Sequence, residues 1–324
     1  MAFSAAVLAL DPQAEVTRIA AAIRTQLQSL RRRGIVLGLS GGIDSSVTAA
    51  LAVEAVGAKR VFGLFMPEAD SDPESLSLGE LLATQLGIES VQQDVAPALA
   101  ALGCYQLRNA AVGAVIPEFA ADWKFKVVAP GSDHQGLSFL SVVARSPTGL
   151  EVRRRLPFAA YLEIIAATNY KQRVRKMVEY MHADRLNYAV AGTPNRLEYD
   201  QGFFVKQGDG AADLKPIAHL YKTQVYQLAQ WLDIPAPIRS RAPTTDTYSL
   251  PQGQDEFYFG LPYDKLDLCL FGRNHGVAAR EVASAAGLTE EQVLRAYADI
   301  DAKRASTRYG HLAPLLVEEI ADVG

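Results

Sequence analysis

The chain has 324 residues, 49% of them hydrophobic and 21% charged, which is typical of a folded globular protein and excludes a disordered one. Its formal net charge of −4 excludes the strong positive field that recruits nucleic acid. Two widely separated cysteines and the absence of any apolar run near the roughly 20 residues of a membrane span favour a cytoplasmic protein without membrane partners.

Strand-like and helical segments alternate along the first third of the chain. After a helix that starts at Asp11-Pro12, short apolar runs typical of buried strands occupy residues 35–39 and 61–66, and residues 89–93 are expected to form a third strand. One helical segment begins at Asp44, after the first of these strands, and a second spans residues 74–86, after the second strand. This alternation predicts an α/β fold with a doubly wound, mostly parallel, Rossmann-like sheet, helices on both faces, and a ligand at the carboxyl ends of the strands.

Residues 95–157 interrupt the alternation. Residues 137–145 and 150–156 read as strands joined by a turn, so we expect an inserted β-hairpin. A long helix over 157–186, a strand over 187–193 and a helix over 220–232 follow, and the polar loop 241–263 is long enough to suggest a functional role. From about residue 264 the pattern is helical, and we expect a single domain over residues 1–324.

The stretch Gly-Leu-Ser-Gly-Gly-Ile-Asp-Ser-Ser at residues 38–46 joins the first buried strand to a helix. Its glycines and serines place backbone N–H groups at a positive helix end, which suits a phosphate or pyrophosphate. The lysine of a Walker A loop is missing, and Asp44 stands where an anion is expected, so a metal ion between carboxylate and phosphates is implied. An ordinary strand-to-helix turn is the alternative, and the complete string favours the functional interpretation.

Several strings in collinear order resemble the NAD synthetase family, which belongs to the N-type ATP pyrophosphatases. They are residues 37–46, Asn169 with 173–175, 192–193 with Glu198, 202–206, 208–213, 222–223 and 243–246. In this family ATP adenylates the nicotinate carboxylate of deamido-NAD with release of pyrophosphate, and ammonia then displaces AMP to give NAD. The resemblance implies this activity, with ATP as co-substrate and Mg²⁺ as cofactor.

The resemblance also implies roles for individual residues. The expected ATP contacts are Gly38, Ser40, Gly41, Gly42, Ser45, Ser46, Met66, Thr193 and Lys222. The expected magnesium ligands are Asp44 and Glu198, and the expected deamido-NAD contacts are Asn169, Arg173, Lys206 and Asp209. The expected catalytic residues are Asp44, Lys222, Asp209 and Asp246. Because Arg173 and Arg175 are two apart on a helix, at most one of them faces the ligand.

Two departures from the family pattern keep alternatives open. Val205 and Gln207 flank Lys206 where the family commonly has threonine and tyrosine. An adenylating amide ligase for a different carboxylate, or a nucleotide-binding subunit without turnover, are therefore the alternatives. No glutaminase domain fits in this length, which implies ammonia that is free or supplied by a separate protein. A homodimer is expected from the resemblance, and no nucleic-acid partner is expected.

Overall fold

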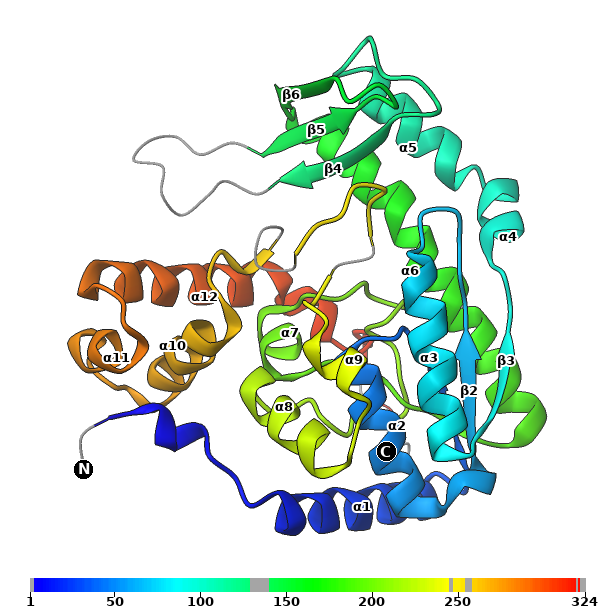
Figure 1. The fold of residues 1–324 in the computed structure, drawn as a ribbon, viewed down its shortest axis with the longest axis vertical. Helices are drawn as coiled ribbons and strands as arrows, with labels where there is room; N and C mark the ends of the chain where they lie inside the picture. Colours follow the sequence, from blue (N-terminus) through cyan, green and yellow to red (C-terminus); the bar gives the residue numbers. More distant parts are fainter. Residues whose placement is uncertain (1–2, 129–139, 245–246, 254–257, 319, 321–324) are drawn as a thin grey trace.

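The computed structural model describes residues 3–128, 140–244, 247–253, 258–318 and 320, and the statements below concern those residues (Figure 1). The strands are β1 (Ile35–Gly38), β2 (Val61–Phe65), β3 (Glu89–Gln92), β4 (Lys124–Val128), β5 (Ser141–Arg145), β6 (Glu151–Arg155) and β7 (Ala189–Val190). The first helices are η1 (Ala5–Leu8), α1 (Pro12–Ser29), α2 (Ile43–Val56), η2 (Ala58–Arg60), α3 (Pro73–Leu86), α4 (Ala96–Ala101), α5 (Cys104–Gly113) and α6 (Phe158–Leu186). The remaining helices are α7 (Arg196–Gln201), α8 (Lys222–Trp231), α9 (Ala236–Ser240), α10 (Tyr263–His275), α11 (Ala279–Ala286) and α12 (Glu290–His311).

The central sheet has four strands in the order β3-β2-β1-β7, and each pair is parallel. Successive residues of a strand point to opposite faces, so Ile35 and Leu37 join a core with α1, α2, α3 and α8. Val36 points the other way and packs with Ala183 of α6. Helices therefore cover both faces, which confirms the predicted doubly wound α/β fold (Figure 1).

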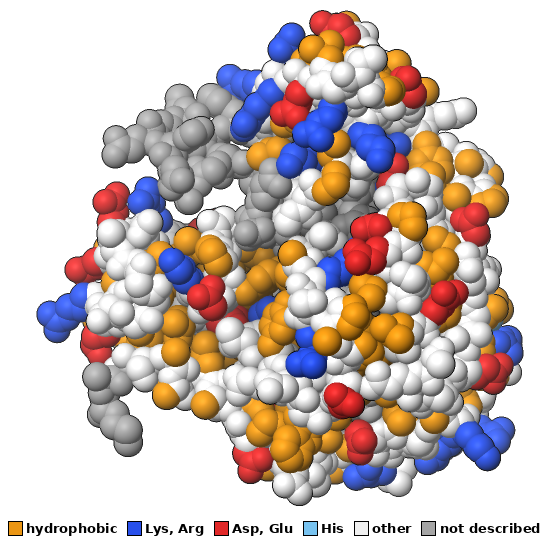
Figure 2. All heavy atoms as spheres, viewed as in Figure 1, with side chains coloured by type: hydrophobic (Ala, Val, Ile, Leu, Met, Phe, Trp, Pro, Cys, Tyr) orange, Lys and Arg blue, Asp and Glu red, His pale blue; other side chains and the backbone are white. Residues whose placement is uncertain are grey.

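The segment that interrupts the alternation forms two short helices, α4 and α5, and a second, antiparallel sheet in the order β4-β5-β6. Within the described residues, the predicted hairpin is confirmed as β5 and β6, whereas β4, α4 and α5 were not expected. Phe125 and Val142 pack with Ile164 of α6 on the inner face of this sheet. Lys and Arg side chains gather over its outer side (Figure 2).

The C-terminal helices α10, α11 and α12 form a separate apolar cluster, as the helical pattern predicted. Thr289 and Gln292 form a capping box at the start of α12. Leu197 of α7 and Tyr221, the residue before α8, belong to the same cluster. These helices thereby fix the N-terminal ends of α7 and α8, which carry Glu198 and Lys222. No helix in the described part of the chain has both the length and the apolar character that crossing a membrane would need.

Candidate active site

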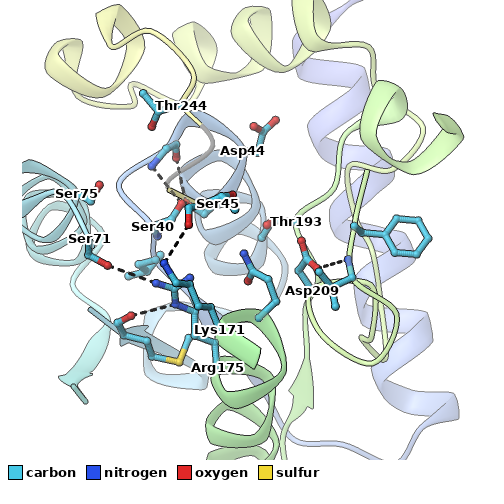
Figure 3. A pocket seen from close by; sticks show the side chains of 18 of the residues that line it. Ser40, Asp44, Ser45, Ser71, Ser75, Lys171, Arg175, Thr193, Asp209 and Thr244 are labelled. Atoms are coloured by element: carbon cyan, nitrogen blue, oxygen red, sulfur yellow. Dashed lines mark hydrogen bonds between the residues drawn. The ribbon is translucent and has the colours of Figure 1, made fainter. Parts of the chain in front are cut away.

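A cavity of about 660 Å³ lies where the parallel strands end, at the edge of the sheet where a ligand was predicted (Figure 3). Its walls come from the ends of β1 and β2, the residues after β7, the starts of α2 and α8, one side of α6, and residues 241–247 where they are described. The predicted residues that line it are Gly38, Ser40, Gly42, Asp44, Ser45, Met66, Asn169, Thr193, Glu198, Asp209 and Lys222. Those that do not line it are Gly41, Ser46, Arg173 and Lys206, and Asp246 lies outside the described residues.

The loop between β1 and α2 forms a compact polar turn. The backbone N–H of Gly42 donates to Ser40 Oγ (3.3 Å), and Ser45 Oγ donates to the carbonyl of Gly42 (3.0 Å). Within the described residues no side chain caps α2 at Gly42, so N–H groups at the positive helix end remain available to an anion. Ser40 and Ser45 lie beside this helix end in the cavity (Figure 3).

Gly41 and Ser46 support this loop from outside the cavity lining. Gly41 has φ +71°, and a Cβ there would stand 2.4 Å from the carbonyl oxygen of Ser75. Glycine is thus required for the approach of the loop to α3. Ser46 is buried, and its hydroxyl donates to the carbonyl of Gly42 (2.8 Å).

Asp44 links three elements at the floor of the cavity. One carboxylate oxygen forms an ion pair with Lys222 Nζ, and the other accepts from Asn195 Nδ2 (3.2 Å). Lys222 is only 1% exposed, so Asp44 supplies the counter-charge that this buried ammonium group requires. Burial, together with the nearby Asp44 carboxylate, raises the pKa of Glu198 to about 8, although Lys222 opposes the shift.

The donor set at this position fits a magnesium ion. Asp44 and Glu198 are close enough for one carboxylate to disfavour ionisation of the other, and a divalent cation between them would relieve that repulsion. The described residues contain no group of three His, Cys, Asp or Glu side chains placed to hold a metal. Two carboxylates suffice for Mg²⁺ when phosphate oxygens and water complete its shell, so these residues suit a cation that binds together with a nucleotide.

Two further residues position this cluster. Asn195 is fully buried and caps α7, and its backbone N–H in turn donates to Glu198 Oε2 (3.2 Å). The Asn-x-x-Glu spacing is a capping-box signature that the sequence carried. Asp267 of α10 accepts from the backbone N–H groups of Lys222 (3.3 Å) and Thr223 (2.7 Å), and burial raises its pKa to about 6. Since Asp267 is 45 residues from Lys222, no local pattern could have found it.

Arg175, rather than Arg173, faces the cavity. Arg175 Nε donates to the carbonyl of Met66 (3.1 Å), and its terminal nitrogen donates to Ser71 Oγ (3.4 Å) (Figure 3). Arg173 is exposed, and its Nε donates to the carbonyl of Lys206 (3.3 Å). The two arginines point to different sides of α6, as the helical spacing requires, and a role for Arg173 in holding deamido-NAD stays a prediction.

Asp209 and Lys206 belong to one loop but point in different directions. Asp209 lines the cavity, accepts from the backbone N–H of Val205 (2.7 Å), and has a pKa raised by burial. Lys206 Nζ instead donates to the carbonyl oxygens of Tyr309 (3.0 Å) and Leu312 (3.3 Å). The predicted contact of Lys206 with deamido-NAD therefore stays a prediction.

Two buried lysines of α6 also line the cavity, although no sequence motif singled them out. Lys171 Nζ lies 2.9 Å from Glu68 Oε1 and 2.7 Å from Asp70 Oδ2. Lys176 Nζ lies 2.6 Å from Glu179 Oε2, and burial raises the pKa of Glu179. In each case the carboxylate provides the counter-charge that allows a lysine to face the protein interior.

Comparison with known proteins agrees with this geometry. The family model described as NAD synthase matches residues 15–117 and 154–307. The NH(3)-dependent NAD(+) synthetase of Rhizobium meliloti (strain 1021) is 60% identical over 324 residues, which are 100% of this chain and 97% of that protein. The protein of the same name from Thermotoga maritima is 34% identical over 251 residues, 76% of this chain and 83% of that one.

Solved structures share the fold. The NMN synthetase of Francisella tularensis superposes with a TM-score of 0.65 at 22% identity, over 95% of this chain and 99% of that one. The NH3-dependent NAD synthetase of Campylobacter jejuni gives 0.63 at 20% identity, over 95% and 100%. The family model and the 60% identical relative show that the chain belongs to the NAD synthase family.

Proposed function

We propose that this chain is an NH3-dependent NAD⁺ synthetase, which adenylates the nicotinate carboxylate of deamido-NAD and lets ammonia displace AMP. The observation that carries the proposal is the ion pair between Asp44 and the buried Lys222. This pair lies beside the start of α2, in the cavity at the strand ends. A helix N-terminus binds phosphates, and a carboxylate next to it is useful only if a cation accompanies them.

In the adenylation step, the N–H groups at the start of α2 and the hydroxyls of Ser40 and Ser45 hold the departing pyrophosphate. Lys222 Nζ, fixed by Asp44, neutralises the charge that develops at the α-phosphate. Asp44 and Glu198 would hold Mg²⁺, which when bound polarises the phosphate oxygens as a Lewis acid. Thr193 lies on the cavity wall within reach of the same nucleotide.

The acid substrate occupies the other side of the cavity in this proposal. Asn169 of α6 and Asp209 line that wall and are the residues we assign to deamido-NAD. Because burial raises its pKa, the Asp209 carboxylate is placed to accept a proton when ammonia attacks the adenylate. Ammonia enters free or from a separate protein.

Incubation with deamido-NAD, ATP, Mg²⁺ and ammonium tests this function. NAD, AMP and pyrophosphate should form in equal amounts, and ADP in place of AMP would rule out the mechanism. Nicotinic acid mononucleotide serves as the competing acid. Pyrophosphate release that ignores deamido-NAD but responds to another acid would select the alternative ligase, and ATP binding without any product would select a non-catalytic subunit.

We also propose a homodimer formed through α6, in the cytoplasm. Exposed apolar side chains lie at the start of this helix, Phe158 (71% exposed) and Leu162 (49%), and in its C-terminal half, Met177 (69%) and Met181 (47%). Arg173 lies on the same side as Met177 and Met181, at helical spacing. In such a dimer Arg173 would lie at the interface, and sedimentation of the chain with and without Met177→Lys tests the arrangement. The free, buried Cys104 and Cys269 support a reducing compartment.

A further inference from the structure

Thr247 contributes to the cavity wall, and the segment that follows it packs against a different part of the molecule. Thr247 lines the cavity, and three of the next five residues, Tyr248, Leu250 and Gln252, are buried to 4%, 5% and 4% exposure. Tyr248 belongs to the apolar cluster of the antiparallel sheet rather than to the core of the parallel sheet. The position of residues 247–252 (hereafter the wall segment) is thus set by the antiparallel sheet.

The wall segment is bound to the free edge of β4. The backbone N–H of Phe125 donates to Ser249 Oγ (2.9 Å), and the N–H of Leu250 donates to the carbonyl of Phe125 (3.0 Å). Gln252 Nε2 donates to the carbonyl of Val127 (2.7 Å). The rings of Phe125 and Tyr248 lie 5.4 Å apart. One main-chain bond and the side-chain bonds of Ser249 and Gln252 therefore fasten the wall segment to the edge of β4.

The sheet that provides this edge lies largely outside the family model, which leaves residues 118–153 unmatched. β4, β5 and most of β6 fall in that interval. The sheet is therefore not part of what the family model describes, although the 60% identical relative aligns over the whole chain. Through the wall segment, the antiparallel sheet contacts a residue that lines the cavity, Thr247.

Lys171 holds the same segment from the opposite side. Its side chain is 2% exposed, and Nζ has three N–H groups to satisfy. Two go to Glu68 (2.9 Å) and Asp70 (2.7 Å), which follow β2, and the third goes to the carbonyl of Thr247 (3.0 Å). The ammonium group thus joins the end of β2, α6 and the wall segment at one point.

We infer that the antiparallel sheet and Lys171 together position the wall segment against the nucleotide, so that Thr247 is in place before ATP binds. Lys171 is a positioning residue, since it acts through the carbonyl of Thr247 and the loop after β2. The link to turnover rests on the proposed function, whereas the link to nucleotide affinity does not.

Two variants separate the supports. Lys171→Met removes the ammonium group and keeps the length of the side chain. Glu68 then retains its bond from Tyr105 (2.9 Å) and Asp70 its ion pair with Arg108, although the buried Glu68 carboxylate loses its counter-charge. Ser249→Ala with Gln252→Leu removes the side-chain bonds to β4 without changing any charge. Arg153→Gln, an exposed position on β6, is the matched control.

The measurements are hydrogen exchange at the Leu250 amide in the ligand-free chain, the Kd of Mg-ATP by calorimetry, kcat, and Tm. Both variants should exchange at Leu250 at least about tenfold faster and bind Mg-ATP about tenfold more weakly, while kcat at saturation changes less than about threefold. Tm should stay within about 3 °C in the uncharged double variant and fall further in Lys171→Met, because the buried Glu68 carboxylate then lacks its counter-charge, and Arg153→Gln should match the parent chain.

Unchanged exchange, or faster exchange with unchanged ATP affinity, would overturn the inference. If Lys171→Met fails to fold, the uncharged double variant gives the same readout. Exchange and ATP affinity require no acid substrate. Failure of the chain to convert deamido-NAD would therefore refute the proposed function and leave this inference standing.

Discussion

The nucleotide side and the acid side of the cavity differ in how far the folded chain has already assembled them. On the nucleotide side, Asp44 directly contacts both Asn195 and Lys222 at the start of α2. On the acid side, the two cations expected for deamido-NAD, Arg173 and Lys206, donate to backbone carbonyls and do not line the cavity. The residues of the nucleotide side are therefore already assembled, whereas Arg173 and Lys206 are held outside the cavity.

The energetic reason for the difference is burial. Separating Lys222 from Asp44 would leave a buried charge without a partner, which typically costs several kcal/mol, so this pair has one arrangement. The bonds of Arg173 and Lys206 to carbonyls are exposed and are each worth about 1 kcal/mol, so a ligand or a second chain could replace them. The nucleotide side should therefore respond strongly to substitution and the acid side weakly.

Asp44→Asn should have the largest effect. The substitution removes the charge that fixes Lys222 and that would hold Mg²⁺, and we expect adenylation to fall at least about 1,000-fold, equivalent to about 4 kcal/mol. Pyrophosphate release measures the loss, and circular dichroism should show the parent fold with a lower Tm, because the buried Lys222 loses its counter-charge. Near-normal turnover in this variant would remove Asp44 from the mechanism.

Lys222→Met should reduce kcat by about 100-fold, because the α-phosphate then lacks its buried cation. The repulsion between Asp44 and Glu198 should also grow, since Lys222 now opposes the rise in the pKa of Glu198. Single-turnover formation of the adenylate is the measurement. A variant that formed the adenylate at the parent rate and lost only ammonia transfer would place Lys222 in the second step instead.

Glu198 should make metal binding depend on pH. With a pKa of about 8 in the ligand-free chain, the carboxyl group must lose a proton before it can hold a cation, so Mg²⁺ affinity should rise up to about tenfold per pH unit and level off above pH 8. Between the ordinary pKa of a glutamate, 4.5, and about 8, the folded chain binds this proton and the unfolded chain does not. The free energy of unfolding should therefore fall as the pH rises through that range. In Glu198→Gln, calorimetry should find both dependences flattened, and an unchanged pH profile would argue against Glu198 as a ligand.

The parallel sheet and the loop at residues 38–46 could be predicted because their signals are local. A buried strand, two glycines and a helix start within a dozen residues fix both the turn and its position at the strand end. β4 was missed although Lys-Phe-Lys-Val-Val carries part of the alternation of a half-buried strand, because its partner β5 begins only at Ser141. Pairing across such a distance leaves no local pattern.

Arg175 could not be identified from the sequence for a different reason. Helical spacing sets the two arginines apart but leaves the phase of the helix open, and apolar residues normally settle that phase. In this part of α6 the apolar residues would give the wrong phase, because Met177 and Met181 are exposed, whereas Lys171 and Glu179 are buried. The buried face of α6 beside the cavity thus carries charged residues, so only the folded structure shows which arginine lines the cavity.

Arg175→Met and Arg173→Met form a matched pair on the two sides of α6. Loss of the Arg175 bonds to Met66 and Ser71, and of its charge in the cavity, should weaken ATP binding about tenfold. Arg173→Met should leave ATP binding unchanged and raise the KM for deamido-NAD. Isothermal titration with Mg-ATP and initial rates with each substrate separate the two effects, and equal losses of ATP affinity would abolish the distinction between the two sides.

Lys206→Met should have the smallest effect on the nucleotide side. The substitution removes two exposed hydrogen bonds from Lys206 Nζ, to the carbonyls of Tyr309 and Leu312. It also removes a cation–π contact in which Nζ lies 4.5 Å from the ring centroid of Tyr309. Water can replace these partners, so the free energy of unfolding should fall by no more than about 1 kcal/mol and the Kd of Mg-ATP should change less than about threefold. A raised KM for deamido-NAD alone would show that Lys206 leaves its carbonyl partners for the acid substrate. A tenfold loss of ATP affinity would instead place Lys206 with the preformed nucleotide side, because a lysine that only donates to the carbonyls of Tyr309 and Leu312 has no route to that effect.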